Sequence, residues 1–148
     1  MKKIVIITIM CLFILGCESS KNRFYLDNEY YGQSGIKEIT SKEINELSKN
    51  KSSFAVFVYM SSCSSCSKFN QILEQFTEKY NISFYSIPVQ EIKDTDICEC
   101  VKYSPSITLY NKGEIVAYLD ANSDRDKQYY ESVNGLENWL TKYIYLKK

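Results

Sequence analysis

Four of the six cysteines in this chain lie in two close pairs, Cys63 with Cys66 and Cys98 with Cys100. The chain has 148 residues and contains no histidine. It therefore lacks the imidazole that Ser-His-Asp and Cys-His catalysis require, and it lacks the commonest nitrogen ligand of zinc and non-haem iron. Any chemistry must come from thiols, carboxylates, lysine or tyrosine side chains, or the backbone.

The placement of Cys63 and Cys66 indicates a redox pair. They follow a run of apolar, β-type residues, 54–60, and they precede a helical pattern of apolar residues. The start of a helix offers unpaired N–H groups and the positive end of the helix dipole, which lower the pKa of a thiol located there. We expect Cys63 to attack a substrate disulfide and Cys66 to resolve the mixed disulfide from a more buried position.

The residues alone leave two other interpretations of Cys63 and Cys66 open. The pair could form a static structural disulfide, or it could form half of a Cys₄ zinc site together with Cys98 and Cys100. A strand followed by a helix is the usual context of a redox motif, whereas zinc knuckles prefer turns. The redox interpretation is therefore favoured, and no metal is expected.

Cys98 and Cys100 are separated by a single residue. A disulfide across one residue closes a small, strained ring, and strained bridges are easily reduced. Because the pair lies five residues before Pro105, one hypothesis is a second redox couple that exchanges electrons with the first. The alternative is a pair of thiols partly buried in a helix.

The elements that position these cysteines alternate between strand-type and helix-type patterns. Thr40 and Glu43 have the spacing of a capping box, which predicts a helix at 41–49, and the apolar run predicts a buried central strand at 54–60. The remaining pattern predicts a strand at 36–39, a helix after Cys66, a strand at 82–87, weak helix at 91–103, a hairpin of strands 107–110 and 115–119, a polar loop at 120–133 and a helix opened by Asn134. This order predicts an α/β fold with a mixed central sheet flanked by helices on both faces.

The amino terminus has the pattern of an export signal. Two lysines precede an apolar run of twelve residues, 4–15, which only Thr8 interrupts and which is too short to span a bilayer. The run ends in Ile14-Leu-Gly-Cys17, which resembles the bacterial lipobox, where the cysteine receives a diacylglyceryl group before cleavage. A plain secretory peptide and a short buried helix are the alternatives.

This pattern divides the chain into three parts. We expect a lipoprotein signal peptide at 1–16, a polar tether at 17–35 that begins with the lipidated Cys17, and a domain at 36–148. The domain would lie at the extracytoplasmic face of the cell membrane, in a compartment where thiols commonly pair. Eighteen basic residues balance eighteen acidic ones, so the chain has no basic footprint for nucleic acid.

Residues 54–69, FAVFVYMSSCSSCSKF, and residues 101–114, VKYSPSITLYNKGE, resemble the thioredoxin-like family. The likeness extends over about residues 36–146 and implies a thioredoxin fold. It implies that Pro105 is a cis-proline and that the Ser104 backbone pairs with an extended substrate segment, the alternative being an ordinary trans proline at a strand start. It further implies a thiol–disulfide oxidoreductase that needs no organic cofactor, acts on protein or peptide thiols and disulfides, and depends on an upstream redox partner.

Several residues depart from the family pattern. Phe57 stands where thioredoxins carry a buried Asp that helps proton transfer to the resolving thiol, and Ser62 replaces the usual Trp. The Ser64-Ser65 spacer is neither the reducing Gly-Pro nor the oxidising Pro-His type. These departures motivate a competing interpretation, a non-catalytic thioredoxin-fold protein that binds a secreted peptide. The Tyr-x-x-x-Cys-x-x-Cys-x-x-Phe stretch is also similar to that of Gram-positive thioredoxin-like proteins linked to bacteriocin export.

Overall fold

The computed structural model describes residues 22–147. Its centre is a five-stranded sheet in the order β1-β3-β2-β4-β5, in which β1, β3 and β2 are parallel and β4 and β5 are antiparallel to their neighbours. The strands are β1 (Gly35–Glu38), β2 (Phe54–Tyr59), β3 (Ser83–Pro88), β4 (Ser106–Asn111) and β5 (Glu114–Tyr118). The predicted α/β fold with a mixed sheet is confirmed.

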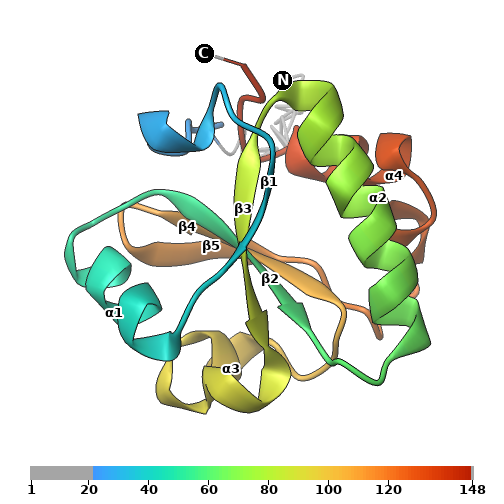
Figure 1. The fold of residues 1–148 in the computed structure, drawn as a ribbon, viewed down its shortest axis with the longest axis horizontal. Coiled ribbons are helices and arrows are strands. Elements are labelled where there is room, and N and C mark those ends of the chain that lie inside the picture. The colour runs from blue at the N-terminus through green and yellow to red at the C-terminus, as the bar shows by residue number, and fades with distance from the viewer. Residues whose placement is uncertain (1–21, 148) are drawn as a thin grey trace, which may run out of the picture.

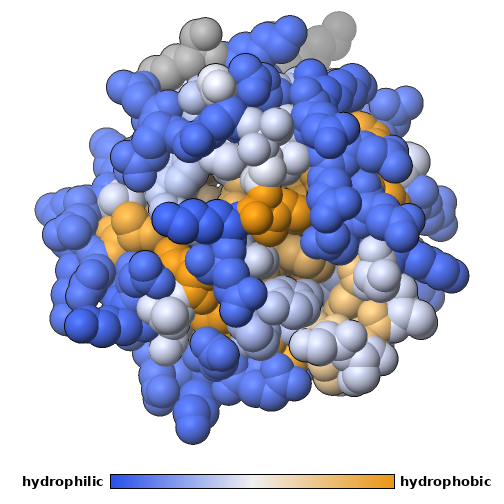
Figure 2. Space-filling model, viewed as in Figure 1, coloured by the Kyte–Doolittle hydropathy of each residue, from blue (hydrophilic) through white to orange (hydrophobic). Residues whose placement is uncertain are grey.

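Helices cover both faces of the sheet. They are α1 (Ser41–Lys49), α2 (Ser64–Tyr80), α3 (Ile97–Cys100) and α4 (Val133–Leu140), with short 3₁₀ helices η1 (Asn28–Tyr30), η2 (Val89–Asp94) and η3 (Lys127–Tyr130). Figure 1 shows α2 and α4 on one side of the sheet and α1 and α3 on the other. On the face in Figure 2, apolar surface gathers between α1 and α2 and is surrounded by hydrophilic side chains.

The central strand β2 explains the continuous apolar run in the sequence. Its first five residues are buried because α2 covers one face of the strand and α1 and α3 lie beyond the other. Phe57 packs against Phe69 of α2 with ring centroids 5.8 Å apart, whereas Phe54 points the opposite way and stacks on Tyr110 at 4.3 Å. Residues at even spacing along β2 thus share one face, and those on the Phe57 face meet the helix that begins at the cysteines.

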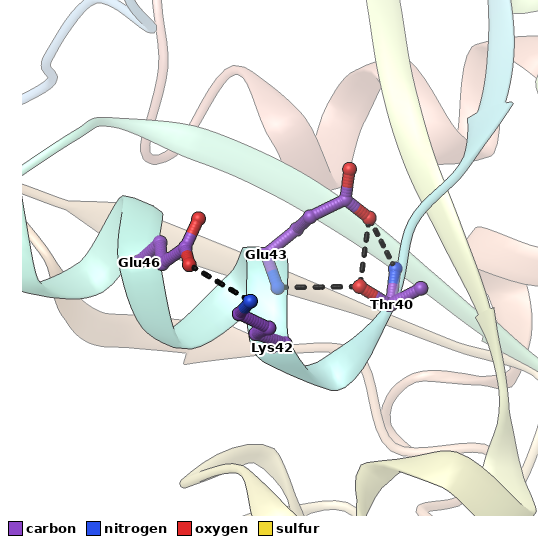
Figure 3. A network of polar contacts seen from close by, with 4 residues as sticks. All are labelled: Thr40, Lys42, Glu43 and Glu46. Carbon is purple, nitrogen blue, oxygen red and sulfur yellow. Dashed lines mark hydrogen bonds and ion pairs between the residues drawn. The ribbon is translucent and has the colours of Figure 1, made fainter.

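The start of α1 is fixed by the predicted capping box (Figure 3). The Glu43 backbone N–H donates to the Thr40 hydroxyl at 3.3 Å, and the Thr40 backbone N–H donates to the Glu43 carboxylate at 2.9 Å. These two bonds satisfy amides that have no partner inside the helix. The ion pair between Lys42 and Glu46 is highly exposed, so it adds little to stability.

The start of α4 differs from the prediction. Ser132 caps the helix, because its hydroxyl accepts the Gly135 backbone N–H at 3.0 Å, and the helix begins at Val133. Asn134, the residue predicted to open the helix as its N-cap, therefore lies inside the first turn. Serine and asparagine cap helices about equally well, so two candidates this close in sequence cannot be separated without the tertiary structure.

Part of the predicted tether belongs to the domain. Leu26 and Tyr30 are 1% and 4% exposed, and Phe24 forms a parallel bridge with Ile144 near the carboxyl end. The prediction of a tether at 17–35 is therefore wrong for residues 24–31, because scattered aromatic side chains in this polar stretch find apolar partners on the sheet. The predicted signal peptide at 1–16, Cys17 and residues 18–21 lie outside the described residues. None of the helices in residues 22–147 combines the length and the hydropathy that a membrane span requires.

Candidate active site

The turn between β2 and α2 places Cys63 at the N-cap position of α2. The Cys66 backbone N–H donates to Cys63 Sγ at 3.1 Å, so the sulfur fills the role that a serine or aspartate oxygen usually fills. The Ser65 hydroxyl lies 3.0 Å from the same sulfur. A negative sulfur at this position gains from both contacts and from the positive end of the helix.

These contacts decide the pKa of Cys63. Partial burial raises the pKa, but the hydrogen bonds from Cys66 and Ser65 outweigh it, and the pKa of Cys63 lies below its usual value. Cys63 is also the more accessible of the two thiols, being half-buried where Cys66 is 3% exposed. Both properties suit an attacking thiolate.

Cys66 has the opposite properties. Burial raises its pKa, and the hydrogen bond with Cys63 raises it further, while contacts with the Met60 backbone and the Ser104 side chain lower it only in part. Cys66 therefore stays protonated under conditions in which Cys63 is ionised. All four cysteines in residues 22–147 are free thiols, which matches a dithiol state of the pair.

The loop before β4 brings Ser104 and Pro105 to the cysteines. The Ser104–Pro105 peptide bond is cis, as the resemblance implies, and the Ser104 side chain reaches the Cys66 thiol. Two predicted site residues from distant parts of the chain are thus brought together with Cys63 and Cys66.

Tyr130 is a positioning residue that the sequence analysis missed. Its hydroxyl lies 2.8 Å from the Pro105 carbonyl oxygen and 3.0 Å from the Leu119 carbonyl oxygen, and its ring lies 4.8 Å from that of Phe69. Burial raises the pKa of Tyr130, so the phenol remains a donor. One side chain from the 120–133 loop therefore ties the Pro105 loop, the end of β5 and α2 together. An aromatic residue in a polar loop was the only signal in the sequence.

Two pockets flank the start of α2. The first, which we call the apolar pocket, has a volume of about 460 Å³ and is lined by Phe69, Tyr103, Pro105, Ala121 and Tyr130 among others. The second, the polar pocket, has a volume of about 450 Å³, lies between α2 and the sheet, and includes Glu38, Phe57, Cys66, Asn70, Glu74 and Ser86. Both thiols line the polar pocket, whereas the apolar pocket begins at their neighbours Ser65 and Ser104.

The structure does not bring Cys98 and Cys100 together. The Cys98 thiol contacts the Lys93 carbonyl oxygen at 3.5 Å, whereas the Cys100 thiol contacts the Ile97 carbonyl oxygen at 3.4 Å. Both residues lie in the single turn of α3, where side chains two positions apart do not face each other. Electron exchange between this pair and the active-site pair stays a prediction.

Residues 22–147 contain no group of three or more candidate ligands placed to hold a metal ion.

Comparisons with known proteins give separate evidence on the family and the fold. The sequence model of the family described as Thioredoxin matches residues 35–132, about two thirds of the chain. A search of curated proteins finds no match.

Several solved structures share the fold. The reduced thioredoxin pre-protein of Schistosoma mansoni has 18% identity and a TM-score of 0.56, and the match covers 75% of this chain and 100% of that one. The oxidised thioredoxin of Plasmodium falciparum has 19% identity and a TM-score of 0.52, with 73% and 97% covered. A mutant thioredoxin of Halobacterium salinarum has 18% identity and a TM-score of 0.54, with 73% and 89% covered.

Replacing Ser65 with Ala should raise the pKa of Cys63, because the sulfur loses one of the contacts that favour its charged form. Since the thiolate is the reactive form, alkylation of Cys63 at neutral pH should slow and its pH profile should move to higher pH. Iodoacetamide labelling followed by mass spectrometry measures this. Ser64→Ala is the matched control, because in residues 22–147 no hydrogen bond joins the Ser64 hydroxyl to Cys63. An equal shift in both variants would contradict the role of Ser65.

Replacing Tyr130 with Phe should lower the free energy of unfolding by about 1–2 kcal/mol, because two carbonyl oxygens lose a buried donor while the ring contacts remain. Urea unfolding measures the change. Tyr129→Phe is the control, since the Tyr129 hydroxyl bonds only to Lys142 at the surface in the described part of the chain. Equal destabilisation by the two variants would show that the Tyr130 hydroxyl does not hold the Pro105 loop.

Proposed function

The chain belongs to the thioredoxin family, and from this we propose that it is a thiol–disulfide oxidoreductase with Cys63 as the attacking thiol and Cys66 as the resolving thiol. The observation that carries the proposal is the difference between the two thiols. Cys63 is accessible, caps a helix and has a lowered pKa, whereas Cys66 is buried and has a raised pKa. A static structural disulfide has no need of such a difference.

In the reducing direction, the Cys63 thiolate attacks one sulfur of a substrate disulfide. A bond forms between Cys63 and that sulfur, the substrate S–S bond breaks, and one substrate thiolate leaves. The Cys66 thiolate then attacks Cys63 Sγ, which forms the Cys63–Cys66 disulfide and releases the second substrate thiolate. The substrate gains two electrons and the protein loses two, so a dithiol of an upstream redox partner must restore the protein. The reverse sequence oxidises a substrate dithiol.

The substrate in this proposal is an extended segment of a protein or peptide. The Ser104 side chain reaches the Cys66 thiol, and in this proposal the Ser104 backbone pairs with the segment in the manner of β-strand addition. The apolar pocket is large enough for a bulky side chain next to the substrate cysteine. Tyr103, which is 54% exposed, offers a further apolar contact at the edge of this pocket.

The proposal also places the protein at the extracytoplasmic face of the cell membrane, held by a lipid on Cys17. The support is the sequence pattern of a basic start, a short apolar run and Gly16-Cys17. Since Phe24 already packs on the domain, at most six residues separate it from Cys17, and the domain would lie close to the membrane. Replacing Cys17 with Ser should abolish incorporation of radiolabelled palmitate into the protein, and continued labelling of that variant would contradict the anchor.

A second candidate function is a non-catalytic protein that binds a secreted peptide, in the manner of an accessory protein in bacteriocin export. One observation favours it. Phe57 is 2% exposed and packs against Phe69 in the place of the family's buried Asp, so the usual proton acceptor is missing there. In that case the cysteines would be dispensable for the cellular role.

Variants of the two cysteines distinguish the candidates. Cys63→Ala should abolish reduction of insulin disulfides and oxidation of dithiol peptides, because no attacking thiol remains. Cys66→Ala should retain the attack but accumulate mixed disulfides, because nothing resolves them, and non-reducing electrophoresis detects these species.

The Cys63→Ser, Cys66→Ser double variant is the test in cells. An oxidoreductase should lose its cellular function in this variant, whereas a binding protein should keep it. The reduction potential of the pair then gives the direction of electron flow, since a value of about −270 mV suits a reductant and one of about −120 mV suits an oxidant. Absence of both activities at every redox buffer setting would remove the enzyme proposal.

A further inference from the structure

Cys66 cannot resolve a mixed disulfide until it loses its proton. It is 3% exposed, and Phe57 supplies no carboxylate beside it. The groups around the thiol are Cys63, Ser104, Tyr130 and the Met60 backbone. The remaining side of Cys66 borders the polar pocket, whose titratable groups are Tyr59, Glu38 and Glu74 in addition to the two thiols. A proton acceptor for Cys66 must therefore be one of the groups that line this pocket.

The floor of the polar pocket is a row of residues across three strands. In the register of the sheet, Glu38 of β1 lies opposite Ser86 of β3, and Ser86 lies opposite Phe57 of β2. Residues in register on neighbouring strands point to the same face, and the contact of Phe57 with Phe69 shows that this face meets α2. Glu38 thus stands on the same row as the residue that replaced the family's Asp, two strands further toward the edge.

The other wall of the pocket is a polar stripe on α2. Cys66, Asn70 and Glu74 are spaced four residues apart, so they lie on one side of the helix above the row of strand residues. The Asn70 amide donates to the Glu74 carboxylate at 2.7 Å. Glu74 is thereby engaged by a neighbour, and it stands roughly 12 Å along the helix from Cys66.

We propose that Glu38 takes the proton from Cys66 across the polar pocket, and so performs from β1 the task that Asp performs from β2 elsewhere in the family. The inference rests on the proposed oxidoreductase function. The pocket, about 450 Å³ in volume, is wide enough for water molecules that connect the two groups, and Ser86 lies between Glu38 and Phe57 on the strand row that forms its floor. Burial raises the pKa of Tyr59, and the nearby Glu38 carboxylate raises it further, so both groups lie close together at this pocket.

The step balances without any further reactant. The Cys66 S–H bond breaks, its proton passes to the Glu38 carboxylate, and the Cys66 thiolate attacks Cys63 Sγ. The Cys63–Cys66 bond forms, the bond from Cys63 to the substrate sulfur breaks, and the substrate thiolate leaves with the electron pair. Glu38 is exposed, so it can return the proton to solvent. In the oxidising direction the same carboxyl group would give the proton back to Cys66.

Glu38→Gln tests the proposal, because glutamine keeps the shape and the hydrogen bonding but cannot accept the proton. The probe is Ellman's reagent added to the reduced protein, with Cys11, Cys17, Cys98 and Cys100 replaced by Ser in every variant so that only the active pair reacts. The first thionitrobenzoate released reports the attack by Cys63, and the second reports resolution by Cys66. Stopped-flow absorbance separates the two phases.

The second phase of Glu38→Gln should be slower by roughly tenfold near neutral pH. The difference should vanish at alkaline pH, where Cys66 ionises without help. Glu74→Gln is the matched control, a carboxylate of the same pocket two helical turns from Cys66, and it should leave the second phase unchanged. Thermal unfolding of each variant checks that the fold is intact.

Three results would overturn the proposal. If the second phase of Glu38→Gln is slower than that of the parent protein by the same factor at every pH, the role of Glu38 is structural. If Glu74→Gln slows the second phase equally, the rate depends on the total negative charge of the pocket and not on Glu38 in particular. If the second phase of Glu38→Gln is faster, the carboxylate only repels the Cys66 thiolate. Because the probe is a small disulfide, the measurement stands even if the protein turns over no protein disulfide, so failure of this inference and failure of the proposed function are distinguishable.

Discussion

The hydrogen bond from the Cys66 backbone N–H to Cys63 Sγ is the contact on which the rest of the site depends. It exists only because β2 ends one turn before α2 begins, so that the sulfur occupies the capping position of a helix whose axis is fixed by the sheet. Through this bond the helix start favours charge on one sulfur while the body of the helix buries the other. Two chemically identical side chains thereby acquire different roles from position alone.

Much of the fold and of the site could be predicted from the sequence, because the features concerned depend on residues that are close together in the chain. The Thr40 capping box, the apolar run of β2 and the cysteine spacing each involve neighbouring residues, and the cis-proline at Pro105 followed from the resemblance. The buried amino-terminal segment and the role of Tyr130 could not be predicted, since both depend on partners more than ten residues away that no local period reveals.

The two pockets give α2 a different neighbour on each side. On one side the helix and Tyr130 form an apolar surface beside the Pro105 loop, where a substrate side chain can be desolvated. On the other side the helix presents polar groups to the row of strand residues. With the buried Phe57 ring packed on Phe69 in this row, no carboxylate lies on β2 beneath Cys66, and the polar side chains of the row, Ser86 and Glu38, stand on the two strands toward the edge.

The pairing of Phe24 with the segment that follows α4 has a mechanical consequence. The Phe24 N–H donates to the Tyr143 carbonyl oxygen, and the Tyr145 N–H donates to the Phe24 carbonyl oxygen, each at 2.9 Å. A pulling force applied at residue 22 would load these two bonds first and pass into the segment after α4 before it reached the sheet. The strands and the start of α2 would bear the force only after these two hydrogen bonds had broken. Tension at the amino-terminal side of the domain therefore does not disturb the geometry of the thiols while the bonds hold.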